Sequence, residues 1–107
     1  MPFYELRQYK IHPGKMDDWI QFMEQEILPF QIGKGMVVTG SYRAENDATI
    51  YIWMRRFENE QQREKLYKAV YESTYWKETI GPRISDFMDR SDVRVTRIIP
   101  TPKSVAQ

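Results

Sequence analysis

Two arginines and three aromatic residues are the side chains in this chain best suited to bind a small molecule. Arg7 and Tyr9 alternate along one strand-like stretch, and Tyr51, Trp53 and Arg55 alternate along another. Guanidinium groups bind carboxylates, enolates and phosphates. Aromatic side chains form the walls of ligand pockets, and their hydroxyl or indole N–H groups can orient a ligand. We therefore expect these residues to line one cavity that binds a small aromatic or anionic organic molecule.

Glu5 is a further candidate, because alternation places it on the same side of its strand as Arg7. The same residues also allow a structural interpretation. Glu5 could form an ion pair with Arg7, and Arg55 could pair with a carboxylate of a partner chain. Aromatic side chains are also favoured in protein interfaces. The sequence leaves both interpretations open.

Residue types exclude several kinds of site. The chain has no cysteine and a single histidine, His12, which precedes Pro13-Gly14 at a strand end. One histidine without cysteine is no recognisable metal motif, and no spacing supports a catalytic triad. We expect His12 to be an exposed turn residue, although it could act as a base. The sequence indicates no metal and no cofactor.

Length and charge set further limits. The 107 residues suffice for one domain, which we place at residues 1–100, followed by a flexible tail over residues 101–107. Sixteen basic residues nearly balance 15 acidic ones, which argues against nucleic-acid binding. No apolar run has membrane length, and the first residues lack the features of a signal peptide. We expect a cytoplasmic protein that binds neither nucleic acid nor membranes.

Hydrophobic periodicity predicts the elements that position these side chains. Strands are expected at residues 3–11, 36–43, 49–57 and 93–99, and helices at 15–30 and 58–73, with helical turns near 75–77 and 84–88. The order β-α-β-β-α-β is that of the α+β ferredoxin-like fold, a four-stranded antiparallel sheet with both helices on one face.

The faces of the two central strands then need assignment. We expect four aliphatic residues to lie beneath the helices, because Glu5 and Arg7 would be costly there unless they were paired; these residues are Leu6, Ile50, Ile52 and Met54. The bare face would then carry Glu5, Arg7, Tyr9, Tyr51, Trp53 and Arg55. A large exposed aromatic surface marks an interaction site, and a second copy of the sheet is its simplest cover. This predicts a homodimer in which two sheets form a barrel.

Several segments resemble the NIPSNAP family. The opening Tyr4-Glu5-Leu6-Arg7-Gln8-Tyr9, followed by His12-Pro13-Gly14-Lys15, is similar to the strand and turn that begin NIPSNAP domains. Tyr51-Ile52-Trp53, Ser73-Thr74-Tyr75-Trp76-Lys77 and Pro82 lie where similar sequences carry comparable residues. The likeness covers Phe3 to Pro100 and implies a dimeric α/β-barrel protein of undefined activity. Related dimeric barrels include cofactor-free monooxygenases, isomerases and decarboxylases, and proteins with no known chemistry.

The leading hypothesis is a homodimer that binds a small organic molecule inside each half of the barrel. An alternative is a cofactor-independent enzyme of the monooxygenase or isomerase type, with Glu5 or His12 as the base. A third is a structural or partner-binding dimer with a filled interior.

Overall fold

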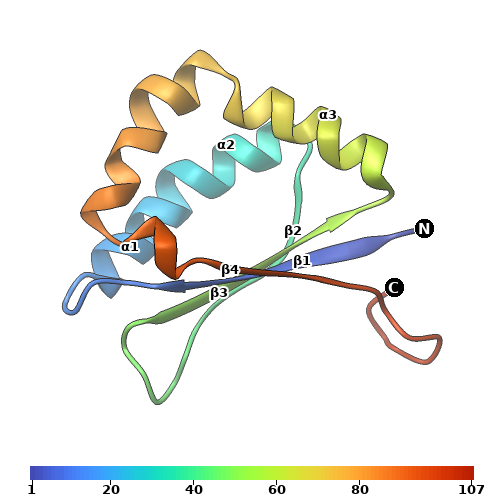
Figure 1. Ribbon diagram of the computed structural model, residues 1–107, viewed down its shortest axis with the longest axis horizontal. Coiled ribbons are helices and arrows are strands. Elements are labelled where there is room, and N and C mark those ends of the chain that lie inside the picture. Colours follow the sequence, from blue (N-terminus) through green and yellow to red (C-terminus); the bar gives the residue numbers. More distant parts are fainter.

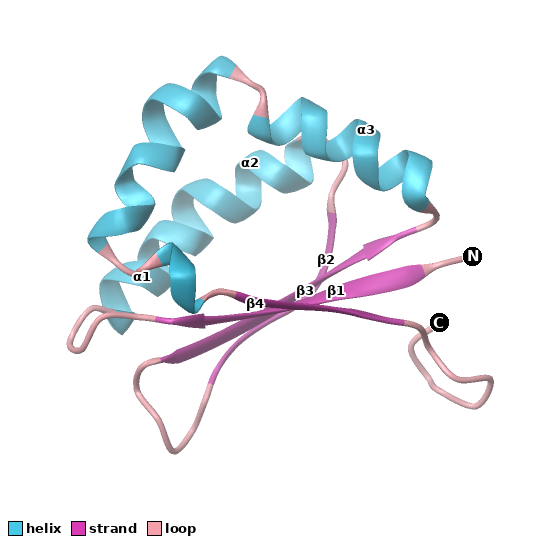
Figure 2. Cartoon of the chain, viewed as in Figure 1, coloured by secondary structure: helices cyan, strands magenta, loops and turns pink.

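A computed structural model describes all residues from 1 to 107. Figure 2 shows strands and helical segments that alternate in the order β-α-β-β-α-β. The elements are β1 (Phe3–Lys10), α1 (Met16–Phe22), η1 (Met23–Ile27), α2 (Leu28–Gly33), β2 (Val37–Arg43), β3 (Ile50–Phe57), α3 (Glu60–Tyr71), η2 (Trp76–Ile80), η3 (Gly81–Asp86), η4 (Arg90–Asp92) and β4 (Arg94–Ile98). The expected order is confirmed.

The four strands form one antiparallel sheet in the order β2-β3-β1-β4. The two central strands are β1 and β3, as the ferredoxin-like arrangement requires. Figure 1 shows that the helical segments cover one face of this sheet and leave the other face open. The predicted fold class is therefore confirmed for the single chain.

The first helical segment runs without a break from α1 through η1 into α2. Its middle turn is a π-helix, in which the Leu28 N–H donates to the Met23 carbonyl five residues earlier. Pro29 follows directly and has no N–H to donate. The segment nevertheless continues to Gly33, beyond the predicted end at residue 30, because Pro29 lies in the first turn of α2.

The second helical segment begins at Glu60 because Asn59 caps it. The Asn59 side chain accepts a hydrogen bond from the Gln62 N–H at 2.8 Å, which explains why the helix starts two residues later than predicted. Ser73 caps the next turn by accepting from the Trp76 N–H at 3.2 Å. That turn is also a π-helix, with the Gly81 N–H donating to the Trp76 carbonyl.

The predicted assignment of the sheet faces is wrong. Tyr51, Trp53, Arg55 and Phe57 are all buried, and they alternate along β3 with half-buried residues. In the β1–β3 register, Glu5 pairs with Arg55, Arg7 with Trp53 and Tyr9 with Tyr51, so these side chains share the helix-covered face. Glu5 and Arg55 can be buried there because they form hydrogen bonds with each other and with side chains of the helices.

The aliphatic side chains accordingly lie on the open face. Leu6 stands opposite Met54 in the register. Ile50, Ile52 and Met54 are half-buried in the single chain, with no helix above them. The centre of the open face is thus aliphatic, where the sequence had predicted rings and charges.

The buried core lies between the sheet and the helices. Trp19 of α1 packs against Tyr9 and Tyr51, with ring centroids 5.9 Å apart in both pairs. A smaller cluster joins Phe3, Met36, Phe57 and Val70 at the other end of the sheet. Rings from the strands thus fill a space that aliphatic side chains were expected to fill.

The last residues turn back towards the first strand (Figure 1). The Gln107 carbonyl accepts hydrogen bonds from Tyr4 at 3.1 Å and from Arg56 at 2.7 Å. The flexibility of this tail stays a prediction. No helix in the chain combines the length and the apolar character needed to span a membrane.

Candidate functional site

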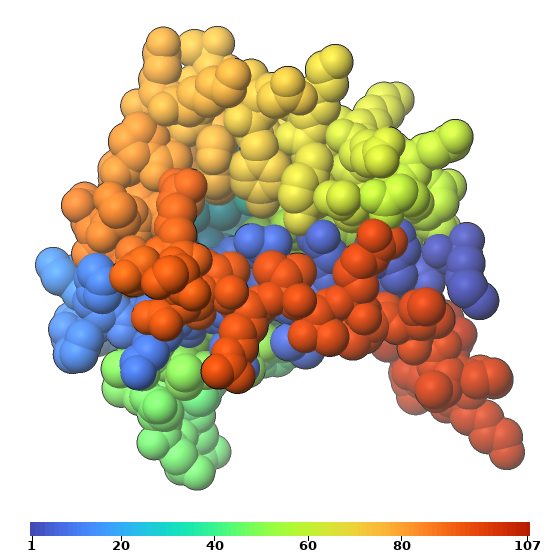
Figure 3. Space-filling model, in the orientation of Figure 1, coloured from blue at the N-terminus to red at the C-terminus, as the bar shows by residue number.

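A cavity of about 270 Å³ lies between the sheet and the helices. Eleven of its 13 lining residues are hydrophobic; the full set is Arg7, Tyr9, Trp19, Met23, Ile27, Trp53, Tyr67, Tyr71, Trp76, Ile84, Met88, Arg90 and Val93. Figure 3 shows a hollow between the yellow and orange helical layer and the blue and red-orange strands, with teal atoms at its back. An apolar cavity with a few polar groups is the usual form of a small-molecule site.

Every layer of the fold contributes to the cavity wall. Arg7 and Tyr9 come from β1, and Trp53 comes from β3. Both π-helical turns take part, because Met23 and Ile27 belong to η1 and Trp76 belongs to η2. Such turns occur mostly as interruptions of α-helices and are frequent at functional sites.

Arg7 provides the charge within the cavity. Its Nε donates to the Tyr9 hydroxyl at 2.8 Å, and its guanidinium lies 5.6 Å from the centre of the Tyr9 ring. Burial alone would lower the pKa of Arg7, but the hydrogen bond to Tyr9 and the electrostatic interactions with Tyr9, Tyr71 and Tyr67 together outweigh burial and raise this pKa. The guanidinium is therefore charged at neutral pH.

No carboxylate balances this charge. None of the six ion pairs in the structure includes Arg7. The cavity lining contains neither Asp nor Glu. Arg7 reaches only hydroxyl groups, those of Tyr9 and, at 3.5 Å, Tyr67. A buried or half-buried cation without an anion is costly, so this cavity is electrostatically suited to an anionic guest.

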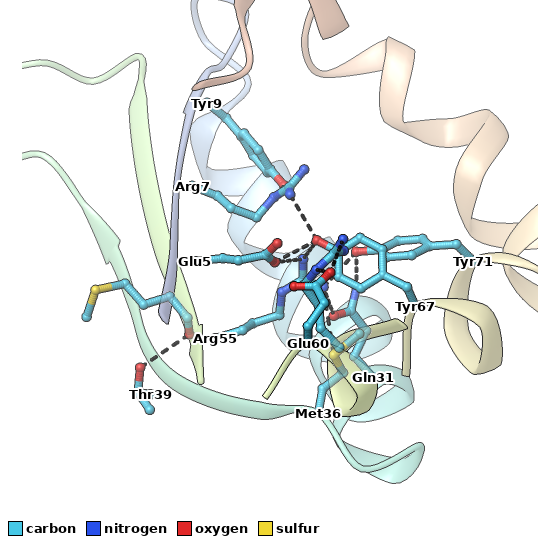
Figure 4. A network of polar contacts seen from close by, with 12 residues as sticks. Glu5, Arg7, Tyr9, Gln31, Met36, Thr39, Arg55, Glu60, Tyr67 and Tyr71 are labelled. Atoms are coloured by element: carbon cyan, nitrogen blue, oxygen red, sulfur yellow. Dashed lines mark hydrogen bonds and ion pairs between the residues drawn. The ribbon is translucent and has the colours of Figure 1, made fainter. Parts of the chain in front are cut away.

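Arg55 has a different environment, shown in Figure 4. Its Nη2 donates to Glu5 Oε1 at 2.9 Å and to the Tyr67 hydroxyl at 2.8 Å. Its Nη1 donates to Gln31 Oε1 at 2.9 Å and to the Tyr71 hydroxyl at 2.7 Å. The side chain is completely buried. Four partners occupy the two terminal nitrogens of Arg55, so this residue has no terminal donor left for a ligand.

Glu5 completes the network. Its Oε1 also accepts from the Tyr67 hydroxyl at 2.6 Å. Burial raises the pKa of Tyr67, although the nearby charge of Arg55 opposes this shift, so Tyr67 is a neutral donor at neutral pH. Glu5 thus pairs with Arg55 rather than with Arg7, and it does not line the cavity. Glu5 and Arg55 therefore form a structural ion pair with each other. The sequence had suggested Arg7 as the partner of Glu5 and a carboxylate of a partner chain for Arg55.

The three aromatic candidates separate into two groups. Tyr9 and Trp53 line the cavity, whereas Tyr51 does not. The Tyr51 hydroxyl instead bonds the Ser41 hydroxyl at 2.5 Å, and burial raises the pKa of Tyr51 to about 12. The indole N–H of Trp53 is enclosed by protein and has no acceptor. Trp53 therefore contributes a flat apolar wall and no hydrogen bond.

Most lining residues were not predicted as site residues, because the cavity had been placed on the other face. Trp19, Met23 and Ile27 lie in the helix predicted at residues 15–30, and they form one wall. Tyr67 and Tyr71 lie one helical turn apart on α3, a spacing that could have indicated a shared polar contact. Arg90 gave no signal in the sequence.

His12 lies outside the cavity. It is exposed, and its backbone N–H donates to the Phe87 carbonyl at 2.7 Å. The expectation of an exposed turn residue is confirmed. No group of three or more His, Cys, Asp or Glu residues is arranged to hold a metal ion.

The chain matches one protein-family model. The NIPSNAP model covers residues 4–104, which includes every residue of the cavity and of the Arg55 network. No curated relative matches the chain at a significant level.

Solved structures with similar folds agree with this match. A NIPSNAP family protein from Agrobacterium tumefaciens is 19% identical with a TM-score of 0.89, and the alignment covers 100% of both chains. An uncharacterized NIPSNAP domain protein from Burkholderia xenovorans is 14% identical with a TM-score of 0.83, over 95% of this chain and 97% of that one. A putative antibiotic biosynthesis monooxygenase from Nitrosomonas europaea is 9% identical with a TM-score of 0.72, over 96% and 93%. At these identities the likeness concerns the fold alone.

Proposed function

Because this chain belongs to the NIPSNAP family, and the family alone does not define a reaction, we propose a function from the chain's own cavity. The protein is a homodimer that binds a small organic anion with an apolar, ring-containing body. The ligand lies between the sheet and the helices of each subunit. Its acid group is held by Arg7, and its body lies against Trp53 and the rings around it.

The observation that carries this proposal is the unpaired charge of Arg7. The cavity offers one half-buried guanidinium, hydroxyl groups beside it and no carboxylate. A guanidinium binds a planar carboxylate through parallel hydrogen bonds. The apolar walls favour an organic acid over a hydrated inorganic ion, because burial of the ligand's rings adds a hydrophobic contribution.

Binding fits this arrangement better than base-dependent catalysis. Neither of the two bases considered from the sequence, Glu5 and His12, is among the lining residues. Glu5 is also committed to Arg55 and Tyr67. The open volume beside Trp53 supports a ligand site within each subunit.

Tryptophan fluorescence offers a direct test, because all three tryptophans of the chain line the cavity. Benzoate and 2-naphthoate should change the emission at saturable concentrations, and each should bind more tightly than its neutral amide. Arg7→Gln should weaken acid binding at least about tenfold, because it removes a charge-assisted hydrogen bond. It should leave amide binding unchanged.

Arg94→Gln is the matched control. Arg94 also lacks a carboxylate partner, but its register with Gln8 places it on the open face of the sheet. This variant should bind both acids like the wild type. The proposal fails if the wild type does not prefer acids over amides, or if Arg7→Gln keeps that preference.

A further inference from the structure

The pairing of arginines across the molecule points to a second charged position in the cavity. Nine arginines occur in the chain. Six of them form ion pairs with carboxylates, namely Arg43, Arg55, Arg56, Arg63, Arg83 and Arg97. The three without such a partner are Arg7, Arg90 and Arg94. Two of these three, Arg7 and Arg90, line the same cavity.

Arg90 lies at the edge of this cavity. It is the first residue of the short helix η4 and is exposed to solvent, whereas Arg7 comes from the centre of β1 and is half-buried. One terminal nitrogen of Arg90 donates to the Gly81 carbonyl at 3.0 Å. This bond ties the Arg90 side chain to the first residue of η3, and Ile84 of η3 also lines the cavity.

Nearby acidic residues leave the guanidinium of Arg90 available. The preceding Asp89 accepts from the Ser91 N–H at 3.0 Å and from the Ser91 hydroxyl at 2.9 Å, through the same carboxylate oxygen. Neither Asp89 nor Asp92 forms an ion pair with Arg90. An arginine has five N–H donors, so most donors of Arg90 remain free for an incoming group.

We propose that the ligand is a dianion, with one acid group on Arg7 inside the cavity and a second acid group on Arg90 at its mouth. This inference depends on the proposed function and narrows its ligand class. A single acid would use only one of the two guanidinium groups in a lining that holds no Asp or Glu. Two acid groups on an apolar body would neutralise both and still place that body against the aromatic walls.

Calorimetry with matched acids tests the second position. Benzoate is compared with phthalate, isophthalate and terephthalate, and 2-naphthoate is compared with naphthalene-2,6-dicarboxylate, so that the spacing of the acid groups varies. At least one dicarboxylate should bind the wild type roughly tenfold more tightly than its monoacid. Arg90→Gln should remove this advantage because it weakens dicarboxylates far more than monoacids, whereas Arg7→Gln should weaken both classes.

Two further variants keep the result interpretable. Arg90→Lys retains the charge and should keep part of the dicarboxylate advantage, while Arg94→Gln should keep all of it. If Arg90 only held η4 to Gly81, Arg90→Gln would weaken monoacids and dicarboxylates equally, and the dianion proposal would be overturned. Dicarboxylates that bind no tighter than monoacids would also overturn it, yet Arg7-dependent binding of monoacids would still support the proposed function. If no acid binds the wild type, both fail.

Discussion

Arg7 and Arg55 show how the same residue type acquires different roles from its surroundings. Both lie on the helix-covered face of the central strands. Arg55 is enclosed by Glu5, Gln31 and two tyrosine hydroxyls, whereas Arg7 contacts hydroxyls alone. Arg55 therefore organises the core, and Arg7 keeps a charge that a ligand can neutralise.

The buried Glu5–Arg55 pair should be sensitive to the loss of one partner. Glu5→Gln leaves an uncompensated buried cation and should lower the free energy of unfolding by roughly 3–5 kcal/mol. The double variant Glu5→Leu/Arg55→Met removes both charges and should be more stable than Glu5→Gln. Urea denaturation followed by circular dichroism measures these differences.

Glu58→Gln provides the control for this prediction. It removes an ion pair with Arg56, but Glu58 is largely exposed, and exposed pairs often contribute nothing measurable. Its urea midpoint should match that of the wild type. If Glu5→Gln were equally harmless, the network would not contribute to stability as inferred.

At the scale of the elements, the helical segments do more than cover the sheet. The first helical segment contains the π-helical turn η1, and a second π-helical turn, η2, follows α3 after a break at Glu72 and Ser73; residues of both turns line the cavity. In a π-helix each N–H donates to a carbonyl five residues earlier rather than four. This wider turn changes the direction of the side chains that follow it. The apolar side chains that line the cavity would therefore point elsewhere if both turns were regular α-helix.

The start of α3 can be tested separately from the cavity. Asn59 accepts from the Gln62 N–H at 2.8 Å, and the Gln62 side chain accepts in return from the Glu58 N–H at 2.7 Å. Asn59→Ala should reduce the free energy of unfolding by about 1 kcal/mol, because it removes the helix cap. Asn59→Asp should retain most of the stability. Thermal and urea unfolding of both variants would decide this, and equal stability of Asn59→Ala and wild type would contradict it.

Seen as a whole, the subunit leaves one face of its sheet without helices. Its central strands present Leu6, Ile50, Ile52 and Met54, with no helix above them. Tyr42 stands opposite Ile52 at the neighbouring strand and is 53% exposed. Contiguous apolar patches of this kind are uncommon on monomers and mark interaction sites. The homodimer thus remains our proposal, with an aliphatic interface in place of the aromatic one predicted from sequence.

Ile52→Lys tests that interface. A lysine at the centre of the open face should convert the dimer into a monomer, because its charge would be buried against the same residue of the partner subunit. The fold of the subunit should persist, since Ile52 lies beneath no helix. Sedimentation velocity at micromolar concentration measures the oligomeric state, and circular dichroism measures the fold.

Ile32→Lys is the matched control for this substitution. Ile32 is another isoleucine, 53% exposed near the end of α2, so the same change there should leave the dimer intact. A wild-type protein that sediments as a monomer would refute the proposed dimer. If the Ile52→Lys variant remained a dimer, the dimer interface would not be the open face of the sheet.

The amino-acid sequence was sufficient to predict the order of the elements, the ferredoxin-like class and the family resemblance. These features depend on local signals: apolar residues at helical spacing, alternation in strands, and breaks such as Pro13-Gly14 and Gly33 to Gly35. The residues that could bind an anion were also recognisable, and Arg7, Tyr9 and Trp53 do meet in one cavity.

The face of the sheet that the helices cover, and hence the place of the cavity, could not be predicted from these local signals. A strand with apolar side chains on both faces gives no local preference, and the choice depends on whether Glu5 and Arg55 can be satisfied when buried. Their partners Gln31, Tyr67 and Tyr71 come from helices that are distant in the sequence. Once those hydrogen bonds form, burial of the charged pair is compensated, the aromatic face turns inward, and the aliphatic face is left open.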